Sequence, residues 1–450
     1  MDIPLSGRQR PVAPPHAVGA AAIATYGLLV LIIATVFAAI DRQILVLLAE
    51  PMRQSLQLSD TKLGLLQGAG ITLFSGLAAL PIGWLADRYG RRSLLAICVL
   101  VWAAATAACG LARDFPSLFL AAAGLGIGEA GLAPIVYGLI PQIVSARRRV
   151  LANGVYALAA IFGAGLGITL SGAMVGQLEL LRPLLPPSWQ DLEPWRLAFL
   201  AVAAPGPLVA LAVLLVRLHP QREGLRQAAP SAALSLLPYS RAHGRTMATV
   251  FGGSGMATLG LAAGSMWLPI IAARHFGAAT ADVGRGIGLA YLLGTAVGAL
   301  AGAAGVKLLG GRLGPALPVR VVGVGAAVAA LAAAAMPFAP DASSLYALFG
   351  VQVAALIAGS VLVPTLLQDM SPEALRSRVI AVGTALSVLL SALSPVLVGA
   401  VSDLLQATPA GLLAAAAGVG ALAFALAAGL MFAAERPYVR TVRAVHPELG

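Results

Sequence analysis

Almost the whole of this chain consists of long apolar segments, and this feature limits its fold more than any other. Of its 450 residues, 59% are hydrophobic and only 10% are charged, whereas soluble domains carry about 25% charged residues. A helix needs roughly 20 consecutive apolar residues to cross a membrane, and the sequence supplies twelve such windows. The windows are helical runs and lack the ten-residue alternation of a membrane barrel. We therefore predict an all-α membrane protein with twelve transmembrane helices.

The predicted spans form two groups of six, separated by a polar and basic stretch. Duplicated halves of this kind are common among secondary transporters. The order predicts an N-terminal segment (1–19), a six-helix bundle (20–218), a linker (219–244), a second six-helix bundle (245–434) and a tail (435–450). The predicted spans are 20–49, 63–85, 93–112, 117–141, 150–177, 195–217, 246–273, 283–309, 316–337, 343–368, 378–406 and 410–434.

Lysine and arginine predict the orientation of the chain. With the N-terminus in the cytoplasm, 21 basic residues fall in inner segments and seven in outer segments, and Arg42 is the remaining one of the 29. Cytoplasmic loops of membrane proteins carry such an excess. We therefore expect both termini in the cytoplasm and a multi-pass protein of the cell inner membrane. The net charge of +11 then follows topology and indicates no nucleic-acid partner.

Three ionisable residues interrupt the apolar segments, namely Asp41 and Arg42 in the first span and Glu129 in the fourth. A charge in hydrocarbon is costly, so such residues usually line a functional pathway. The helical rise places Asp41 roughly 13 Å and Glu129 roughly 18 Å below the same membrane face. Adjacent helix positions face different neighbours, so Glu129 is a candidate partner for Arg42. A static structural triad is the alternative.

The charge balance at this depth points to proton coupling. Two carboxylates and one guanidinium sum to −1 when all are ionised, and arginine keeps its proton. In a low dielectric, one acid is then expected to hold a proton. We therefore predict that Asp41 or Glu129 carries the transported proton. We expect Arg42 to bind an anionic substrate group, such as a phosphate or a carboxylate.

Three aromatic residues are candidates for the wall of a substrate cavity. Tyr137 lies two turns beyond Glu129 on the same predicted helix, and Trp267 and Tyr291 lie in the second half. Amphipathic rings suit such a wall, and they are also common at membrane interfaces. The second half has no charge clearly in mid-span. The expected cavity is charged on one wall and apolar on the other, which suits an amphiphile.

The loop between spans 2 and 3 carries the most specific motif, GWLADRYGRR at 83–92. A glycine at its start lets two helices approach closely, and a second glycine permits a tight turn. Its arginines can pair with acids or with helix C-terminal carbonyls. The alternative is a plain positive-inside loop. The residues of interest are Gly83, Asp87, Arg88, Gly90, Arg91 and Arg92.

This loop resembles the signature loop of the major facilitator superfamily, whose members have twelve spans in two halves and work by alternating access. The resemblance implies that the six loop residues form a cytoplasmic gate, with Asp87 against the start of span 11 near Arg378. Other segments resemble the spinster branch, which is associated with lysolipids and sphingoid phosphates. These segments are 39–43 (AIDRQ), 58–60 (LSD), 64–66 (GLL), 126–130 (GIGEA), 195–199 (WRLAF) and 394–403 (SPVLVGAVSD).

Together these features predict a secondary active transporter for an amphiphilic or anionic small molecule. We expect proton coupling and export, in a monomer whose partners are its substrate, protons and membrane lipids. One alternative is an importer that moves an organic anion with a proton. Another is a membrane-embedded lipid-modifying enzyme, which usually needs clustered acids for Mg²⁺ or a histidine with an acid partner. The sequence shows neither pattern, so we expect no enzyme activity, no cofactor and no metal.

Overall fold

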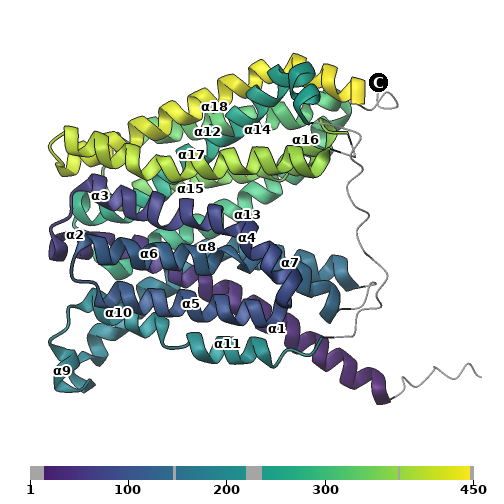
Figure 1. Ribbon diagram of the computed structural model, residues 1–450. Helices are drawn as coiled ribbons and strands as arrows, with labels where there is room; N and C mark the ends of the chain where they lie inside the picture. The colour runs from purple at the N-terminus through teal and green to yellow at the C-terminus, as the bar shows by residue number, and fades with distance from the viewer. Residues whose placement is uncertain (1–14, 145–147, 219–235, 373–374, 446–450) are drawn as a thin grey trace, which may run out of the picture.

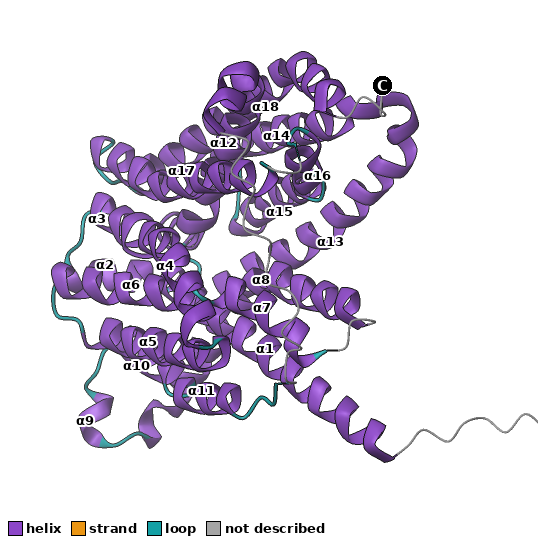
Figure 2. Ribbon diagram, turned by 45° about the vertical axis from the view of Figure 1, so that its right-hand side comes forward, coloured by secondary structure: helices purple, strands orange, loops and turns teal. Residues whose placement is uncertain are grey.

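The computed structural model describes residues 15–144, 148–218, 236–372 and 375–445, which are helical apart from short connections (Figures 1 and 2). No strand occurs in these ranges, so the predicted all-α class is confirmed. The first half contains α1 (Pro15–Leu47), α2 (Ala49–Leu56), α3 (Asp60–Leu65), the π-helix η1 (Leu66–Leu73), α4 (Phe74–Tyr89), α5 (Arg91–Leu111), α6 (Phe115–Ala130), α7 (Leu132–Ile143), α8 (Arg149–Leu181), α9 (Pro187–Gln190), α10 (Pro194–Ala203) and α11 (Gly206–Leu214). The second half contains α12 (Leu236–Phe276), α13 (Thr280–Leu313), α14 (Leu317–Ala335), α15 (Ala342–Ser360), α16 (Val363–Asp369), α17 (Arg376–Leu404) and α18 (Pro409–Val445).

The described chain has ten helical stretches that are long and apolar enough to cross a membrane. The number rises to eleven if the bent pair Leu151–Ala160 and Phe162–Leu178 counts as one span. One of the ten, Thr280–Phe338, contains both α13 and α14. The protein is therefore a multi-pass membrane protein. Twelve crossings and cytoplasmic termini remain predictions.

Two helices extend beyond the predicted spans of the second half. α12 begins at Leu236, inside the predicted linker, and it bends at His243, whose backbone is not helical. α18 continues to Val445, through most of the predicted tail. The two extensions support each other, because the His243 ring lies 3.2 Å from the Thr441 hydroxyl. Of the predicted linker, residues 219–235 lie outside the described ranges.

The two halves lie side by side as helix bundles, the first half running from purple through blue to teal and the second from teal through green to yellow in Figure 1. In the first half, α1 packs along α8, and α5 packs along α6, α10 and α11. In the second half, α12 packs along α17 and α18, and α13 packs along α15. Two seams join the halves, one between α8 and α13 and the other between α17 and the α3–η1 segment.

Local sequence explains where several helices begin. Asp114 accepts a hydrogen bond from the Ser117 amide at 2.9 Å and completes a capping box at the start of α6. Asp341 caps α15 in the same way through the Ser344 amide. Gly90 separates α4 from α5 and adopts φ +94°, a conformation that side chains with a Cβ rarely allow. The tight turn predicted at Gly90 is therefore confirmed.

The seam between α17 and α3–η1 is too close for side chains at three positions. A Cβ at Gly64, Gly68 or Gly399 would collide with the backbone of the opposite half. Further along, α17 makes little contact with α4. The halves therefore meet tightly at one end and diverge at the other. We call the end with Asp60 and Gly399 the closed end, and the end with Gly90 the loop end.

Substituting Gly68 by alanine is expected to destabilise the protein by about 1–3 kcal/mol, the usual cost of overpacking. The added methyl group would meet the Ala392 carbonyl, which is backbone and cannot rotate away. Gly429 in α18 is the matched control, because nothing lies within 4 Å of a Cβ built there. We expect a clear fall in the melting temperature of purified Gly68→Ala and none in Gly429→Ala. Equal melting temperatures would contradict the close seam.

Candidate transport site

Arg42 of α1 and Glu129 of α6 form an ion pair inside the candidate spans Ile23–Leu47 and Phe115–Ile143. Arg42 Nη2 lies 2.7 Å from Glu129 Oε2, and Arg42 Nε donates to the same oxygen at 2.9 Å. The Glu129 side chain is 4% exposed, whereas the Arg42 side chain is 49% exposed. The predicted pairing is thus confirmed. It holds the carboxylate inside the bundle and leaves about half of the Arg42 side chain exposed.

Asp41 is fully buried beside this pair. Neither of its carboxylate oxygens has a hydrogen-bond partner among the described residues. The Thr106 hydroxyl is near enough to interact with it, but donates to the Trp102 carbonyl at 2.9 Å. An ionised carboxylate without donors is costly in such surroundings. Asp41 and Glu129 therefore lie in different environments. Two acids in different environments can take different roles in proton binding.

The structure places the three candidate aromatic residues differently. Tyr137 is 47% exposed and packs edge-to-face on Tyr156 with ring centroids 5.0 Å apart. Tyr291 packs edge-to-face on Phe349 at the same separation. Trp267 is fully buried, so it faces no open space in this conformation. Arg42 and Tyr137 are each about half exposed, and the binding roles of Arg42 and of the three aromatic residues remain predictions.

A second ion cluster joins the two halves at the closed end. Arg274 of α12 donates to both oxygens of Asp60, at 2.7 and 3.0 Å, and to Glu50 of α2 at 2.6 Å. The side chains of Arg274 and Glu50 are each 7% exposed, and that of Asp60 is 0% exposed. One guanidinium of the second half thus holds two acids of the first. Bidentate, dry ion pairs of this kind are strong and directional.

Asp403 of α17 makes the reciprocal contact to the first half. Its carboxylate accepts hydrogen bonds from the backbone amides of Asp60 and Thr61, at 3.1 and 3.0 Å, and from the Thr61 hydroxyl at 2.6 Å. Ser402 donates to Asp60 at 2.7 Å. The first amides of a helix have no partner within the helix. Asp403 therefore caps α3 from the opposite half of the protein.

The closed-end cluster was not predicted from the sequence, where Arg274 counts only as one of seven outer basic residues. The signal that could have found it is topological. Glu50, Asp60, Arg274 and Asp403 all lie at span ends that the predicted topology assigns to the same membrane face. Acids and an arginine at one face, divided between two halves, indicate pairs between the halves. Within the described chain, no group of His, Cys, Asp or Glu is arranged to hold a metal ion.

Glu50 makes the stability of the closed end depend on pH. Burial alone raises the pKa of Glu50, but hydrogen bonds from Arg53 and the charge of Arg274 outweigh burial and hold that pKa below its usual value. A depressed pKa contributes stability above the unfolded pKa, which is about 4.3 for glutamate. That contribution is lost as the pH falls through the lower folded value. The Glu50 contacts therefore stabilise the closed end at neutral pH and weaken only in stronger acid.

We expect the melting temperatures of the native chain and Glu50→Gln to differ at pH 7 and to converge below about pH 4. At neutral pH the variant lacks the negative charge that Arg274 and Arg53 hold. In acid the native Glu50 is itself protonated, so the two proteins carry the same charge at this position. Thermal melting of both proteins across this pH range is the measurement. A difference in melting temperature that stays constant over the whole pH range would contradict the stabilising role of the ionised Glu50.

The signature loop lies at the loop end and contacts the first half. Arg91 donates to the Gly138 carbonyl of α7 at 2.9 Å, and Arg92 donates to the Val216 carbonyl after α11 at 3.1 Å. Arg88 lies over the ring of Trp84, 5.4 Å from its centroid. These arginines therefore bind carbonyls and rings next to the loop.

Two further predictions for this loop have different outcomes. Nothing lies within 4 Å of a Cβ built at Gly83, so the close helix approach expected there is wrong for this conformation. The reason is that α4 and α17 diverge at this end. The Asp87 side chain lies outside the described residues, so its contact with the start of span 11 near Arg378 stays a prediction. The gate role of the six loop residues stays a prediction as well.

A bacterial homologue of the human lysosomal transporter Spinster, solved in an inward-facing and unoccupied conformation, superimposes with a TM-score of 0.76. The two are 23% identical, and the match covers 95% of this chain and 98% of that one. At this level of identity the likeness shows a shared fold.

Curated relatives match over shorter stretches. An MFS-type efflux pump of Mycolicibacterium smegmatis is 27% identical over 193 residues, 43% of this chain and 40% of the relative. A probable L-galactonate transporter of Escherichia coli is 31% identical over 153 residues, 34% of each protein. The chain thus spans less than half the length of either relative. The family model of the Major Facilitator Superfamily matches residues 31–395, and the chain therefore belongs to this superfamily.

Proposed function

We propose that this protein is a proton-coupled secondary transporter that moves an amphiphilic or anionic small molecule across the cell inner membrane by alternating access. The observation that carries this proposal is the Arg42–Glu129 pair, in which the Arg42 side chain is half exposed, with Asp41 buried next to it and without a hydrogen-bond partner among the described residues. Membership of a transporter family favours transport over the membrane-enzyme alternative. The buried pair supplies both a group that recognises an anion and a group that binds a proton.

The arrangement of the two ends supports alternating access. The excess of basic residues in the predicted inner segments supports a cytoplasmic position for the loop end and an outer position for the closed end. Arg274, Asp60 and Asp403 tie the halves together at the outer face, while α4 and α17 diverge at the inner face. The described conformation is then closed to the outside and faces the cytoplasm. In the opposite state these outer contacts break, and the signature loop closes on α17.

Proton transfer and substrate binding are linked through Arg42. When Glu129 is ionised, its Oε2 holds Arg42 through the hydrogen bond from Nε and the ion-pair contact with Nη2. A proton from water bound to Glu129 cancels that charge, and Arg42 can then turn to a phosphate or carboxylate of the substrate. When the substrate leaves, Arg42 pairs again with Glu129 and the proton returns to water. Asp41 is a second proton-binding group at the same depth.

The substrate class follows from the groups around Arg42. A planar guanidinium grips two oxygens of a phosphate or carboxylate, and the half-exposed Tyr137, two turns beyond Glu129, is a candidate for an amphipathic surface. A lysolipid or a sphingoid phosphate combines such a headgroup with an apolar chain, which the second half can accommodate because it has no charge clearly in mid-span. The fold shared with the bacterial spinster homologue supports this choice.

The direction of transport has two candidates, and each has support. The similarity to an efflux pump supports export. The linkage through Arg42 supports the second candidate, import of an organic anion with a proton, because protonation of Glu129 promotes anion binding and the two then move together. The similarity to a probable L-galactonate transporter agrees with this second candidate.

The proposal is tested with purified protein in liposomes under an imposed pH gradient. The panel contains lysolipids, sphingoid phosphates and small organic anions, each supplied inside or outside the vesicles. Movement of an anion with the proton flux supports the importer, and movement against it supports the exporter. If the protein is correctly folded and every compound still moves at the same rate as in empty vesicles, the proposed transport function is wrong.

Arg42→Lys is expected to lose most of the transport activity, by at least about tenfold, because an ammonium lacks the planar fork that binds two oxygens. The charge is retained, so a simple loss of charge cannot explain the result. Arg285→Lys is the matched control, since Arg285 forms an exposed pair with Asp282 and its side chain is 74% exposed. Initial uptake rates in the same liposomes are the measurement. Equal rates for the two variants would remove Arg42 from the substrate site.

A further inference from the structure

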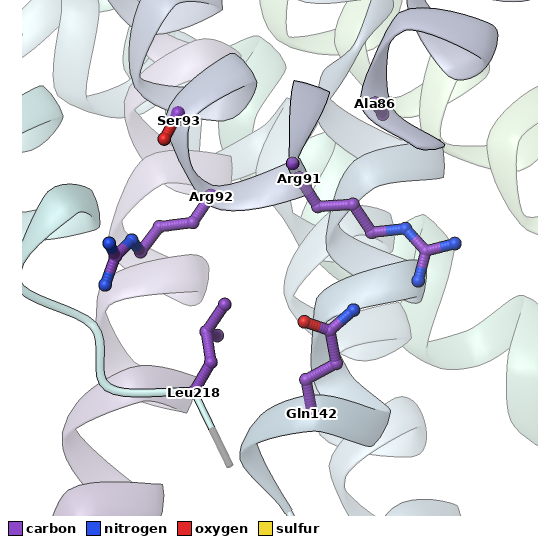
Figure 3. A pocket seen from close by; sticks show the side chains of 7 residues that line it. Ala86, Arg91, Arg92, Ser93, Gln142 and Leu218 are labelled. Atoms are coloured by element: carbon purple, nitrogen blue, oxygen red, sulfur yellow. The ribbon is translucent and has the colours of Figure 1, made fainter. Parts of the chain in front are cut away.

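An apolar groove of about 480 Å³ runs along the second half, between residues 286–297 of α13 and residues 343–354 of α15. It differs in kind from the polar cavity under the signature loop, where Arg91 and Arg92 extend to opposite sides (Figure 3). The two walls of the groove are equal in length. Eleven residues of helical rise on each side make it roughly 16 Å long.

Close packing of glycines against α15 creates the groove. A Cβ at Gly286 would collide with the ring of Tyr346, and a Cβ at Gly294 would collide with the backbone of Gly350. Glycines let two helices approach closely in a membrane. Leu289 and Leu293 stand beside this contact and are 56% and 57% exposed. The groove is therefore a channel between two tightly packed helices, with exposed leucines along one edge.

The groove opens on the outer surface of the second bundle. The side of α15 that lies half a turn from the groove is buried, because Phe349 and Gln352 are 0% and 1% exposed and both lie against Gly264 of α12. Both walls lie inside candidate membrane spans, Thr280–Phe338 and Ala342–Asp369. An exposed apolar surface in such a span meets lipid chains, so a soluble partner cannot reach it.

The two ends of the groove differ in polarity. Tyr346 lies one turn from the start of α15, at the closed end, and its buried hydroxyl has no hydrogen-bond partner among the described residues. Ser343 lines the same end. From there toward the middle of the span the lining is apolar, as far as Val297 and Ala354. A single polar end followed by an apolar channel matches the polarity of an acyl chain that begins at an ester.

We propose that the groove binds one acyl chain of a phospholipid from the leaflet at the closed end, with its ester carbonyl accepting a hydrogen bond from the Tyr346 hydroxyl. A phospholipid in this leaflet has its ester near the membrane face and its chain toward the midplane, which is the polarity of the groove. A buried hydroxyl without a partner is costly, and the ester would supply the missing acceptor. The binding site does not depend on the proposed transport function.

The test uses the full-length protein in nanodiscs of phosphatidylethanolamine, a small fraction of which carries a photoreactive diazirine on one acyl chain. After illumination, the cross-linked peptides are mapped by mass spectrometry. We expect the cross-links to concentrate on residues 286–297 and 343–354. The reference surface is α14, where Val324 and Leu331 are 54% and 74% exposed. Equal cross-linking of α14 and of the groove would overturn the proposal.

Tyr346→Phe tests the hydrogen bond with little risk to folding, because it keeps the ring and removes a hydroxyl that bonds to none of the described residues. Cross-linking in the groove is expected to fall about twofold to tenfold, as one neutral hydrogen bond is lost. Tyr26→Phe is the matched control, since Tyr26 is a 40% exposed tyrosine of α1 outside the groove. Equal cross-linking in the two variants would overturn the proposal.

Ala347→Phe tests the apolar part of the groove. Ala347 is an exposed groove residue, so a ring placed there is expected to fill the channel and abolish the cross-links. Ala414→Phe is the matched control, because Ala414 is exposed and lies five residues after the start of α18, as Ala347 does in α15. Cross-linking that persists in Ala347→Phe would overturn the proposal. Displacement of the probe by palmitate, which has a chain but no ester, would overturn the assignment to a phospholipid.

Discussion

Replacing Glu129 by glutamine is expected to abolish the response of transport to a pH gradient while leaving substrate binding intact or tighter. Glutamine has the shape of a protonated glutamate but cannot exchange the proton. Arg42 then loses the charge that holds it at 2.7 Å and stays available to the substrate. One coupled proton supplies about a tenfold accumulation per pH unit. The variant is expected to equilibrate its substrate without this accumulation.

Accumulation in liposomes and substrate affinity are the two measurements for Glu129→Gln. Asp282→Asn is the matched control, because Asp282 also pairs with an arginine but its side chain is 65% exposed. The control is expected to keep both its affinity and its response to pH. Asp41→Asn completes the series. If Glu129→Gln and Asp41→Asn each transport with normal pH dependence, neither residue carries the proton and the coupling mechanism is wrong.

Replacing Arg274 by glutamine is expected to open the closed end. The change leaves Glu50 and Asp60 buried without their shared cation. Removing one partner of a buried ion pair costs about 3–5 kcal/mol. Separation of the halves would let water reach both acids, so most of this cost falls on the closed state. The equilibrium should then shift toward the outward-open state by about a hundredfold or more.

Spin labels across the closed end measure this shift. Arg113 and Ser343 are exposed positions of the two halves at this end, and cysteines placed there can carry the labels. The native Cys98 and Cys109 are both buried and unpaired, and they are replaced first. Arg274→Gln is expected to lengthen the distance between the labels. The matched control Arg285→Gln breaks an exposed pair on the same face and should leave that distance unchanged. An equal change in both variants would contradict the proposal that Arg274 holds the closed end together.

The helical fold could be predicted from the sequence because lipid leaves few choices to the backbone. Inside the membrane, each amide must bond within its own segment, so a long apolar window becomes a helix. The helix ends were harder to predict. α12 begins at Leu236 and α18 continues to Val445, both beyond the apolar windows. The extensions contact each other, because the Thr441 hydroxyl of α18 lies within hydrogen-bond distance of side chains of α12.

The candidate site was predicted in part, for reasons that differ between its residues. Glu129 could be predicted as a candidate partner of Arg42 because helical rise sets the similar depth of both residues. The burial of Trp267 does not follow, because a helix that is apolar all round gives no signal for its inner face. The cluster around Arg274 depends on which conformation brings the halves together. Periodicity within one span carries no information about such contacts between halves.

The capping of α3 by Asp403 makes local helix stability depend on the conformation of the whole protein. Only when the halves meet do the amides of Asp60 and Thr61 have acceptors from α17. Loss of a helix cap costs about 0.5–2 kcal/mol, so the first turn of α3 should fray whenever the closed end opens. Hydrogen–deuterium exchange at these two amides would then report the state of the unlabelled, native protein. The two backbone amides would thus serve as an intrinsic reporter of conformation that needs no label.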